Sequence, residues 1–489
     1  MILTDRQVSY ALNDCRIAQL FTGTTHLEPL VALDQQIVQR SYLRPEPVFV
    51  PAPQPQPGLR PHAHLRLLPL DDSHVVAFVP SISQIAVLNQ AAVALLQQLP
   101  VAAQDALPEI AYLHALGLLT NDDRAAPEPE EPQVLAAWLH VSNACNLRCS
   151  YCYIQKNHEH MDAATARAAI DAVVRSALHH GYCGVVLKYA GGEPLLNLAV
   201  IAEAHHYAIE QAAIHHLALQ ASVLSNGAIL NSAHVQQLQA LGLGLTISLD
   251  SLDESHNQQR PTRSGGNSLG AVVAGIECAI AGGLRPAIAV TATAANLHGL
   301  PELVAWLLER DLEFTLSFAR DAGCGATMLD LRAEEARIIA ALRRVYAVIA
   351  ANPPAWSVLN ALLDRADLSR PHSLPCSAGK HYLVIDQHGG VAKCQMTIRE
   401  SVASIRDHDP LATLRASNTG LQNIPVDQRA GCRSCEWKYW CAGGCPIATF
   451  RATGRYDIQS PNCGIYQALY PDLIRLEGIR ILQRAQWPV

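Results

Sequence analysis

The chain has 489 residues, of which 49% are hydrophobic and 16% are charged, and its formal net charge is −7. This composition excludes extended disorder, and the length predicts about two to four domains with a large buried interior. The acidic balance excludes the basic face that nucleic acid or an anionic membrane would need, so we expect neither as a partner. The sequence has no basic segment followed by an apolar signal stretch and no long uncharged apolar run, so we expect a cytoplasmic protein.

Residues 1–130 are predicted to form a separate N-terminal region. An acidic, Pro-containing stretch at 121–133 predicts a linker to the next domain. Two short strands are expected at 64–70 and 74–80, and short apolar helices follow them. The segment 63–120 is therefore predicted to be a small α+β domain.

Between residues 134 and 352, strand-like runs alternate with amphipathic helical stretches. The six predicted strands lie at 134–142, 183–190, 219–226, 243–250, 286–294 and 313–319. Strands that alternate with helices in this way predict an α/β fold with a parallel sheet covered by helices. Six units favour a partial (β/α)6 barrel over a closed barrel of eight strands.

The chain contains 14 cysteines, which is unusual for a protein expected in a reducing compartment, where structural disulfides are rare. Metal or cluster ligation is therefore the expected role of the cysteines that lie close together. Three of them follow the first predicted strand, at Cys145, Cys149 and Cys152. Among the isolated cysteines, Cys324 follows the sixth predicted strand and is a weak catalytic candidate, with a passive thiol as the alternative.

The first cysteine group lies in the stretch CNLRCSYC, at the carboxyl end of a strand, where β/α proteins carry their chemistry. This stretch resembles the signature of the radical S-adenosylmethionine (SAM) superfamily. The resemblance implies that Cys145, Cys149 and Cys152 hold a 4Fe-4S cluster whose fourth iron is open to chelate SAM. Half of a zinc site and three ordinary thiols are the alternatives.

The same resemblance implies a set of SAM contacts at the ends of the next three strands. Gly191-Gly192-Glu193 would hold the methionyl ammonium, and Asn226, at the end of the third strand, is a further candidate for binding SAM. Ser248 would contact the ribose, and Arg260, twelve residues later, would bind the carboxylate. A turn, a strand-end cap and a solvated surface charge are the structural alternatives for these positions.

A second cysteine group lies near the C-terminus. Its seven members resemble the SPASM auxiliary-cluster domain, and a zinc ribbon is the alternative. The resemblance implies one 4Fe-4S cluster on Cys432, Cys435, Cys441 and Cys463 and a second cluster, one thiolate short, on Cys376, Cys394 and Cys445. The expected domains are a bridge at 353–375, the SPASM domain at 376–470 and a terminal helix at 471–489.

Together these motifs cover roughly residues 134–470 and resemble the SPASM peptide maturases, which modify ribosomally made peptides. Residues 63–120 resemble their winged-helix peptide-recognition domain, with a helical cap as the alternative. The expected partners are a precursor peptide with a leader, bound by strand addition, and an external electron donor such as flavodoxin or ferredoxin.

Two other functions remain open. The related anaerobic sulfatase maturases use a base directly after the second SPASM cysteine, whereas Gln395 stands there in this chain and cannot accept a proton. A non-catalytic iron–sulfur carrier or peptide-binding protein is the alternative from another class.

Overall fold

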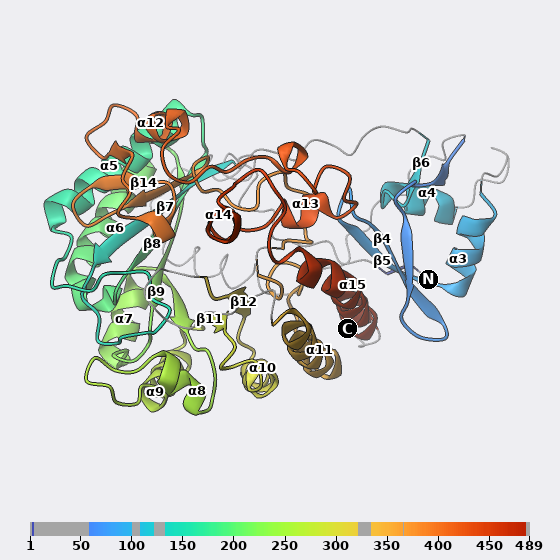
Figure 1. Ribbon diagram of the computed structural model, residues 1–489, viewed down its shortest axis with the longest axis horizontal. Helices are drawn as coiled ribbons and strands as arrows, with labels where there is room; N and C mark the ends of the chain where they lie inside the picture. The colour runs from blue at the N-terminus through green and yellow to red at the C-terminus, as the bar shows by residue number, and fades with distance from the viewer. Residues whose placement is uncertain are drawn as a thin grey trace, which may run out of the picture.

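The computed structural model of the chain describes residues 2–3, 58–99, 108–121, 133–320, 334–364 and 366–485. Cys324 and most of the region before residue 58 lie outside the described residues, as does most of the acidic linker. Figure 1 shows a large α/β unit at one end, a small N-terminal domain at the other, and part of the C-terminal region between them.

The α/β unit is built on a sheet of nine strands in the order β12-β11-β10-β9-β8-β7-β13-β14-β15. Six of these strands follow one another in sequence and pair in parallel. They are β7 (Val134–Ser142), β8 (Gly184–Gly191), β9 (Ala218–Ser225), β10 (Gly244–Ser248), β11 (Ala287–Ala292) and β12 (Phe314–Phe318). The six predicted β/α units are therefore confirmed.

Helices connect these strands and cover the sheet. They are α5 (Ala163–His179), α6 (Leu198–Ile214), α7 (Ser232–Ala240), α8 (Glu254–Gln259), α9 (Leu269–Ala281), α10 (Leu300–Glu309) and α11 (Glu335–Ala351). The start of α5 shows the local logic: Asp162 caps the helix by accepting a hydrogen bond from the backbone N–H of Thr165 at 2.7 Å. The same helix buries Ala169 and Val173 in the core, so its apolar face follows the helical period.

The C-terminal region extends this sheet, which the sequence did not predict. β13 (Tyr382–Ile385) pairs in parallel with β7, and β14 (Gly390–Ala392) and β15 (Ala403–Ser404) continue the sheet in antiparallel order. Short helices follow: α12 (Pro410–Ala416), α13 (Lys438–Cys441) and α14 (Pro446–Thr453). The cysteine-rich region is thus joined to the large α/β sheet by backbone hydrogen bonds.

The described residues of the small N-terminal domain form a sheet in the order β1-β5-β4-β3 and two helices. Its elements are β1 (Ile2–Leu3), β3 (Arg66–Pro69), β4 (His74–Val79), β5 (Gln84–Asn89), α3 (Gln90–Gln97) and α4 (Pro108–Ala115), with β2 (Arg60–Pro61) paired to β6 (Leu119–Thr120). The segment 84–89 lies in the apolar run after the second predicted strand, where helices were expected, and it forms the strand β5 instead. Its apolar run suits either structure, and pairing with β4 along six residues decides for a strand.

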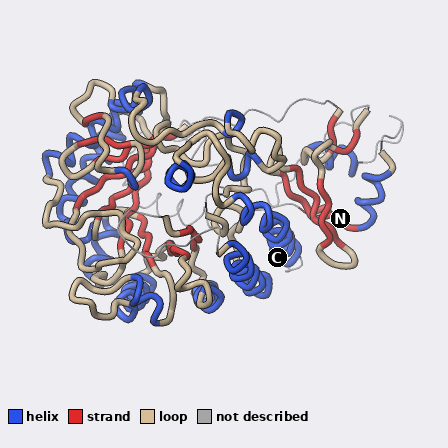
Figure 2. The backbone as a smooth tube through the Cα atoms, in the orientation of Figure 1, coloured by secondary structure: helices blue, strands red, loops and turns tan. Residues whose placement is uncertain are grey.

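The two faces of β4 pack against different cores, because neighbouring side chains of a strand point in opposite directions. Ala77 and Val79 pack within the small domain, whereas Val76 and Phe78 belong to the main core. Figure 2 shows these strands as a group apart from the large sheet, with helices between the two groups. The N-terminal domain is therefore docked through one face of its sheet.

The helix at this junction is α15 (Cys463–Ala485), which packs along α11 and against β4 and β5. It was predicted to begin at residue 471, but it begins at Cys463 and carries Pro471 inside it. A proline is favoured at a helix start, which explains the wrong boundary, and tertiary packing overrides that preference here. No helix of the described residues has the length and apolarity needed to cross a membrane.

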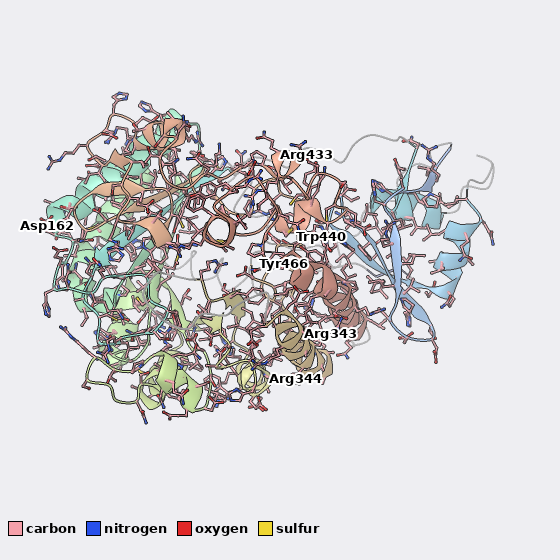
Figure 3. The ribbon with its side chains drawn as sticks, viewed as in Figure 1. Asp162, Arg343, Arg344, Arg433, Trp440 and Tyr466 are labelled. Carbon is pink, nitrogen blue, oxygen red and sulfur yellow. The ribbon has the colours of Figure 1, made fainter. Side chains whose placement is uncertain are left out.

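Aromatic side chains of the C-terminal region also contact the N-terminal domain. The ring of Trp437 stacks on that of Phe78 at 5.7 Å, and Trp440 Nε1 donates a hydrogen bond to Ser83 Oγ at 2.9 Å. Figure 3 shows Trp440 and Tyr466 in the region between the barrel and the N-terminal domain.

Candidate functional site

The loop of the first cysteine group is fastened to the end of β8 by the Gly-Gly-Glu segment. The backbone N–H of Gly192 donates to the Ser142 carbonyl at 2.6 Å, and that of Glu193 donates to the Ala144 carbonyl at 2.8 Å. A Cβ atom on Gly192 would stand 2.3 Å from the Ala144 oxygen, and Gly191 has a φ of +155°. Glycine is therefore required at both positions by the close approach of the segment that leads into Cys145.

The carboxylate of Glu193 is completely buried and ties the end of β8 to the end of β9. It accepts hydrogen bonds from the hydroxyl of Ser225 at 2.8 Å, the backbone N–H of Asn226 at 2.7 Å and that of Leu195 at 3.1 Å. Burial raises the pKa of Glu193 to about 7, and these hydrogen bonds oppose the rise. The carboxylate thus acts on the protein backbone in this structure, and its contact with SAM remains a prediction.

Asn226 connects this junction to the cysteine loop. Its Nδ2 lies 3.7 Å from the Sγ atom of Cys145 and donates to the side chain of Asn146 at 2.8 Å. The structure therefore brings Glu193 and Asn226 to the first cysteine, and their predicted contacts with SAM stay predictions.

Three buried side chains, those of Arg260, Tyr151 and Asp250, hold the other side of the loop that carries the first cysteine group. Arg260 Nη1 donates to the Tyr151 hydroxyl at 2.6 Å, and that hydroxyl donates to the Asp250 carboxylate, which lies 3.7 Å from Arg260. Arg260 Nε is buried without a hydrogen-bond partner. Ser248 ends β10 and is half-buried, two residues before Asp250. Arg260 is thus adjacent to the loop, but its guanidinium is already held by protein groups.

A cavity of about 500 Å³ opens beside the cysteines and is lined by Arg148, Cys149, Ser150, Cys152, Ile154, Lys156 and Pro261. Lys156 Nζ donates to the Leu147 carbonyl at 2.8 Å, which holds this ammonium at the cavity wall. Two thiols and two cations in one cavity suit an anionic cluster with a carboxylate ligand beside it. The residues present therefore fit the implied cluster and SAM.

Four groups at the site were not expected from the sequence: the side chains of Arg148, Lys156 and Asp250 and the hydroxyl of Tyr151. Arg148 and Tyr151 lie inside the cysteine motif itself, so their positions could have suggested a role. Asp250 gave no local indication, because it meets Tyr151 across 99 positions of sequence.

The C-terminal cysteines gather into the two predicted groups. Burial, together with the nearby thiol of Cys441, raises the pKa of Cys432 to about 12 and that of Cys463 to about 11. Cys376, Cys394 and Cys445 pack around Ala378 and Ile447 instead. Thiolate ligands in such surroundings need a cationic partner, since burial favours the protonated thiol.

Arg429 supplies positive charge between the two groups. Its side chain is fully buried, and it donates to the carbonyls of Ile424 at 2.9 Å and Gly443 at 3.0 Å, while Nη2 has no partner. The thiols of Cys432 and Cys376 are both close enough to affect its pKa, which burial lowers. A buried guanidinium requires an anion, so this orphaned nitrogen fits the thiolate-bound clusters that the SPASM resemblance implies.

Within the described residues, no three His, Cys, Asp or Glu side chains converge on a position for one metal ion. The ligands of a four-iron cluster bind different irons and therefore stand farther apart than those of a single ion.

The profile of the Radical SAM superfamily matches residues 139–314. GTP 3',8-cyclase of Paenarthrobacter nicotinovorans is 33% identical over 201 residues, which are 39% of this chain and 52% of that protein. The radical SAM cyclopropyl synthase TigE of Paramaledivibacter caminithermalis is 27% identical over 160 residues, 30% of this chain and 32% of that protein. The chain spans only about half of the first curated relatives it matches, 57% and 52% of their lengths.

Among solved structures, anSMEcpe with bound AdoMet and Cp18Cys peptide has a TM-score of 0.56 and 18% identity. The match covers 71% of this chain and 99% of that one, and it supports the fold. The family match contains the cysteine loop and its cavity, and it defines residues 139–314 as the catalytic region of a radical SAM enzyme. The non-catalytic carrier considered from sequence is therefore disfavoured.

Proposed function

We propose that the chain is a radical SAM peptide maturase with two auxiliary iron–sulfur clusters. The observation that carries this proposal is the placement of the second cysteine group. β13, which lies between Cys376 and Cys394, pairs directly with β7, the strand that leads into the SAM cysteine loop. Burial raises the pKa of Tyr153, and the nearby thiols of Cys152 and Cys394 raise it further, so this side chain lies close to both cysteine groups.

The residues of the barrel have distinct roles in this proposal. A cluster on Cys145, Cys149 and Cys152 would supply the electron that cleaves SAM to methionine and a 5'-deoxyadenosyl radical, which removes hydrogen from the substrate. Glu193 and Asn226 hold the loop in place. Arg148 and Lys156 contribute positive charge to the cavity in which the carboxylate of SAM would bind.

The proposed substrate is a ribosomally made peptide. The solved structure of the same fold holds a peptide as well as AdoMet, and TigE is named as a cyclopropyl synthase. A leader segment would add to the exposed edge of β3, the outer strand of the N-terminal sheet. The product would be a crosslink, thioether, epimer or oxidised residue, and flavodoxin or ferredoxin would supply the electron.

Two other substrates follow from particular observations. The identity with GTP 3',8-cyclase favours a nucleotide, although that match covers 39% of this chain. A formylglycine-generating activity would need a base after Cys394, where Gln395 begins the short helix η3 (Gln395–Thr397). Because an amide does not take up a proton at neutral pH, this second activity is disfavoured.

The experiment uses the full chain, reconstituted anaerobically with iron and sulfide and reduced with dithionite in the presence of SAM. It is offered either GTP or the peptide encoded by a small open reading frame beside its own gene. We expect 5'-deoxyadenosine together with a mass shift of the peptide, and deuterium transfer into 5'-deoxyadenosine from a deuterated peptide. Turnover of GTP with no change in the peptide would overturn the proposal, and so would tight zinc in place of iron at the C-terminal cysteines.

A further inference from the structure

Arg320 reaches from the barrel to a cysteine of the C-terminal group. It stands two residues after β12, and its Nη1 donates to the Phe318 carbonyl at 3.0 Å. Its Nε donates to the Sγ atom of Cys445 at 3.2 Å. The side chain is only 11% exposed, so this contact is shielded from water.

A buried carboxylate fixes the direction of this guanidinium. Asp364 Oδ1 accepts from Arg320 Nη2 at 2.6 Å and from the backbone N–H of Phe318 at 3.0 Å. The other oxygen of Asp364 accepts from the hydroxyl of Tyr466, on α15, at 2.8 Å. Asp364 has a φ of +49°, a left-handed conformation that Asp and Asn tolerate better than most residues. Three parts of the chain therefore meet here: the end of β12, the segment that follows α11, and the helix α15. Together they direct Arg320 Nε toward the thiol of Cys445.

This arrangement has a consequence for any cluster bound through Cys445. The reduction potential of an iron–sulfur cluster depends on its net charge, its exposure and the hydrogen bonds to its sulfur atoms. A buried, charge-assisted hydrogen bond to a ligand sulfur stabilises the reduced state, which carries one more electron than the oxidised state. The hydrogen bond from Arg320 Nε therefore affects the reduction potential of such a cluster, and it also links the end of β12 to the C-terminal cysteine region.

We propose that Arg320 is a positioning residue that raises the reduction potential of the auxiliary cluster bound through Cys445. The inference rests on the proposed function only in that a cluster must occupy Cys376, Cys394 and Cys445. Asp364 opposes part of the positive charge of Arg320 while it holds the side chain in place. The pair thus sets how readily this cluster accepts an electron from a donor or a substrate radical.

The test is a redox titration of the reconstituted full chain, followed by electron paramagnetic resonance. The radical SAM cysteines are replaced together by alanine, so that the auxiliary signals are seen alone. Arg320→Gln, which keeps an amide donor and removes the charge, is expected to lower the ratio of reduced to oxidised cluster at a fixed potential at least tenfold. A tenfold change corresponds to about 59 mV for a one-electron couple. Arg320→Lys, which retains the charge, is expected to lower the ratio less.

Asp364→Asn is expected to change the reduced fraction of the cluster in the opposite direction. It removes the countercharge, tolerates the positive φ and should raise the reduced fraction. The matched control is Arg343→Gln, which breaks an ion pair of 2.9 Å with Asp472 between α11 and α15, leaves the contact of Arg320 with Cys445 in place and should leave the titration unchanged.

Two results separate this inference from the proposed function. If Arg320→Gln and Asp364→Asn both titrate like the parent with full iron content, Arg320 does not tune the cluster and the inference is wrong. If Arg320→Gln fails to take up iron, the test uses the shifts in the reduced fraction of the cluster in Arg320→Lys and Asp364→Asn. Equal shifts in the same direction in these two variants would overturn the inference about Arg320. If Cys445→Ala changes neither the iron content nor the spectrum, the proposed auxiliary cluster itself is absent.

Discussion

Arg260 and Tyr151 form a hydrogen bond of 2.6 Å that joins the region after β10 to the middle of the cysteine loop. The phenol also donates to Asp250, so it lies between a buried cation and a buried anion. Buried charges depend on such partners, because water cannot replace them. The arginine expected to bind the SAM carboxylate is therefore positioned by the loop that would hold the cluster.

Tyr151→Phe should slow the formation of 5'-deoxyadenosine by about 10-fold to 100-fold, since a hydrogen bond to a charged group contributes about 1.5–3 kcal/mol. The iron content should stay at the wild-type level, because no thiol is changed. The control is Tyr207→Phe, which removes a hydrogen bond of 2.7 Å to Asp171 on the helical surface. Equal rates for wild type and Tyr151→Phe would show that the trio of Arg260, Tyr151 and Asp250 does not support SAM cleavage.

The cysteine loop gives the second prediction. With three 4Fe-4S clusters, the wild-type chain should carry about twelve irons, and Cys149→Ala should lose about four of them. Dithionite-dependent cleavage of SAM should disappear in this variant, measured as 5'-deoxyadenosine by mass spectrometry. Cys278→Ala is the control, because this half-buried cysteine lies on α9 and belongs to neither group. Persistent cleavage in Cys149→Ala would place the radical cluster elsewhere.

The strands and the cysteine groups could be predicted because each has a recognisable pattern within a short stretch of sequence. Short β-rich runs separated by amphipathic helices fixed the six strands, and the spacing of the cysteines indicated their grouping. The pairing of β13 with β7 and the contact of Arg320 with Cys445 could not be predicted. The second contact joins residues 125 positions apart, and no local pattern encodes it. The segment 84–89 failed for another reason, since a short apolar run has no period that separates a strand from a helix.

Glu193 gives a prediction for the pH dependence of stability. Burial raises its pKa from 4.5 to about 7, so between these values the native state binds more protons than the unfolded state. The native state therefore loses stability as the pH rises through this window, by on the order of 3 kcal/mol at about 1.4 kcal/mol per pH unit. Glu193→Gln cannot titrate and should lack this loss.

The measurement is the difference in Tm between wild type and Glu193→Gln at pH 5.5, 6.5 and 7.5. We expect the wild type to fall relative to the variant as the pH rises. Glu203→Gln is the control, because it also replaces a glutamate by glutamine, but the carboxylate of Glu203 is exposed and forms an ion pair with Arg167 at 2.9 Å. A difference that stays constant over this range would contradict a raised pKa at Glu193.

The N-terminal domain provides the last prediction, and its packing decides how it must be tested. Deleting residues 1–130 would expose the faces of α15 and Trp437 that now contact Val76 and Phe78, so a deletion would damage the main core as well as remove the domain. A single substitution on β3, the outer strand of this sheet among the described residues, is the sharper test. Leu67 lies on the edge strand β3 and is a large apolar side chain that is 37% exposed.

Leu67→Glu should weaken binding of the precursor peptide at least tenfold, because a charge replaces the apolar side chain beside which a leader strand would add. Cleavage of SAM without peptide should be unchanged, since all the residues of the cysteine loop lie in the barrel. The matched control is Ile214→Glu, an equally drastic change at an exposed apolar residue of α6. Fluorescence anisotropy of a labelled leader, measured beside 5'-deoxyadenosine formation, compares the two variants. Wild-type leader affinity in Leu67→Glu would exclude the β3 edge, and loss of SAM cleavage in the same variant would show that the small domain supports the barrel instead.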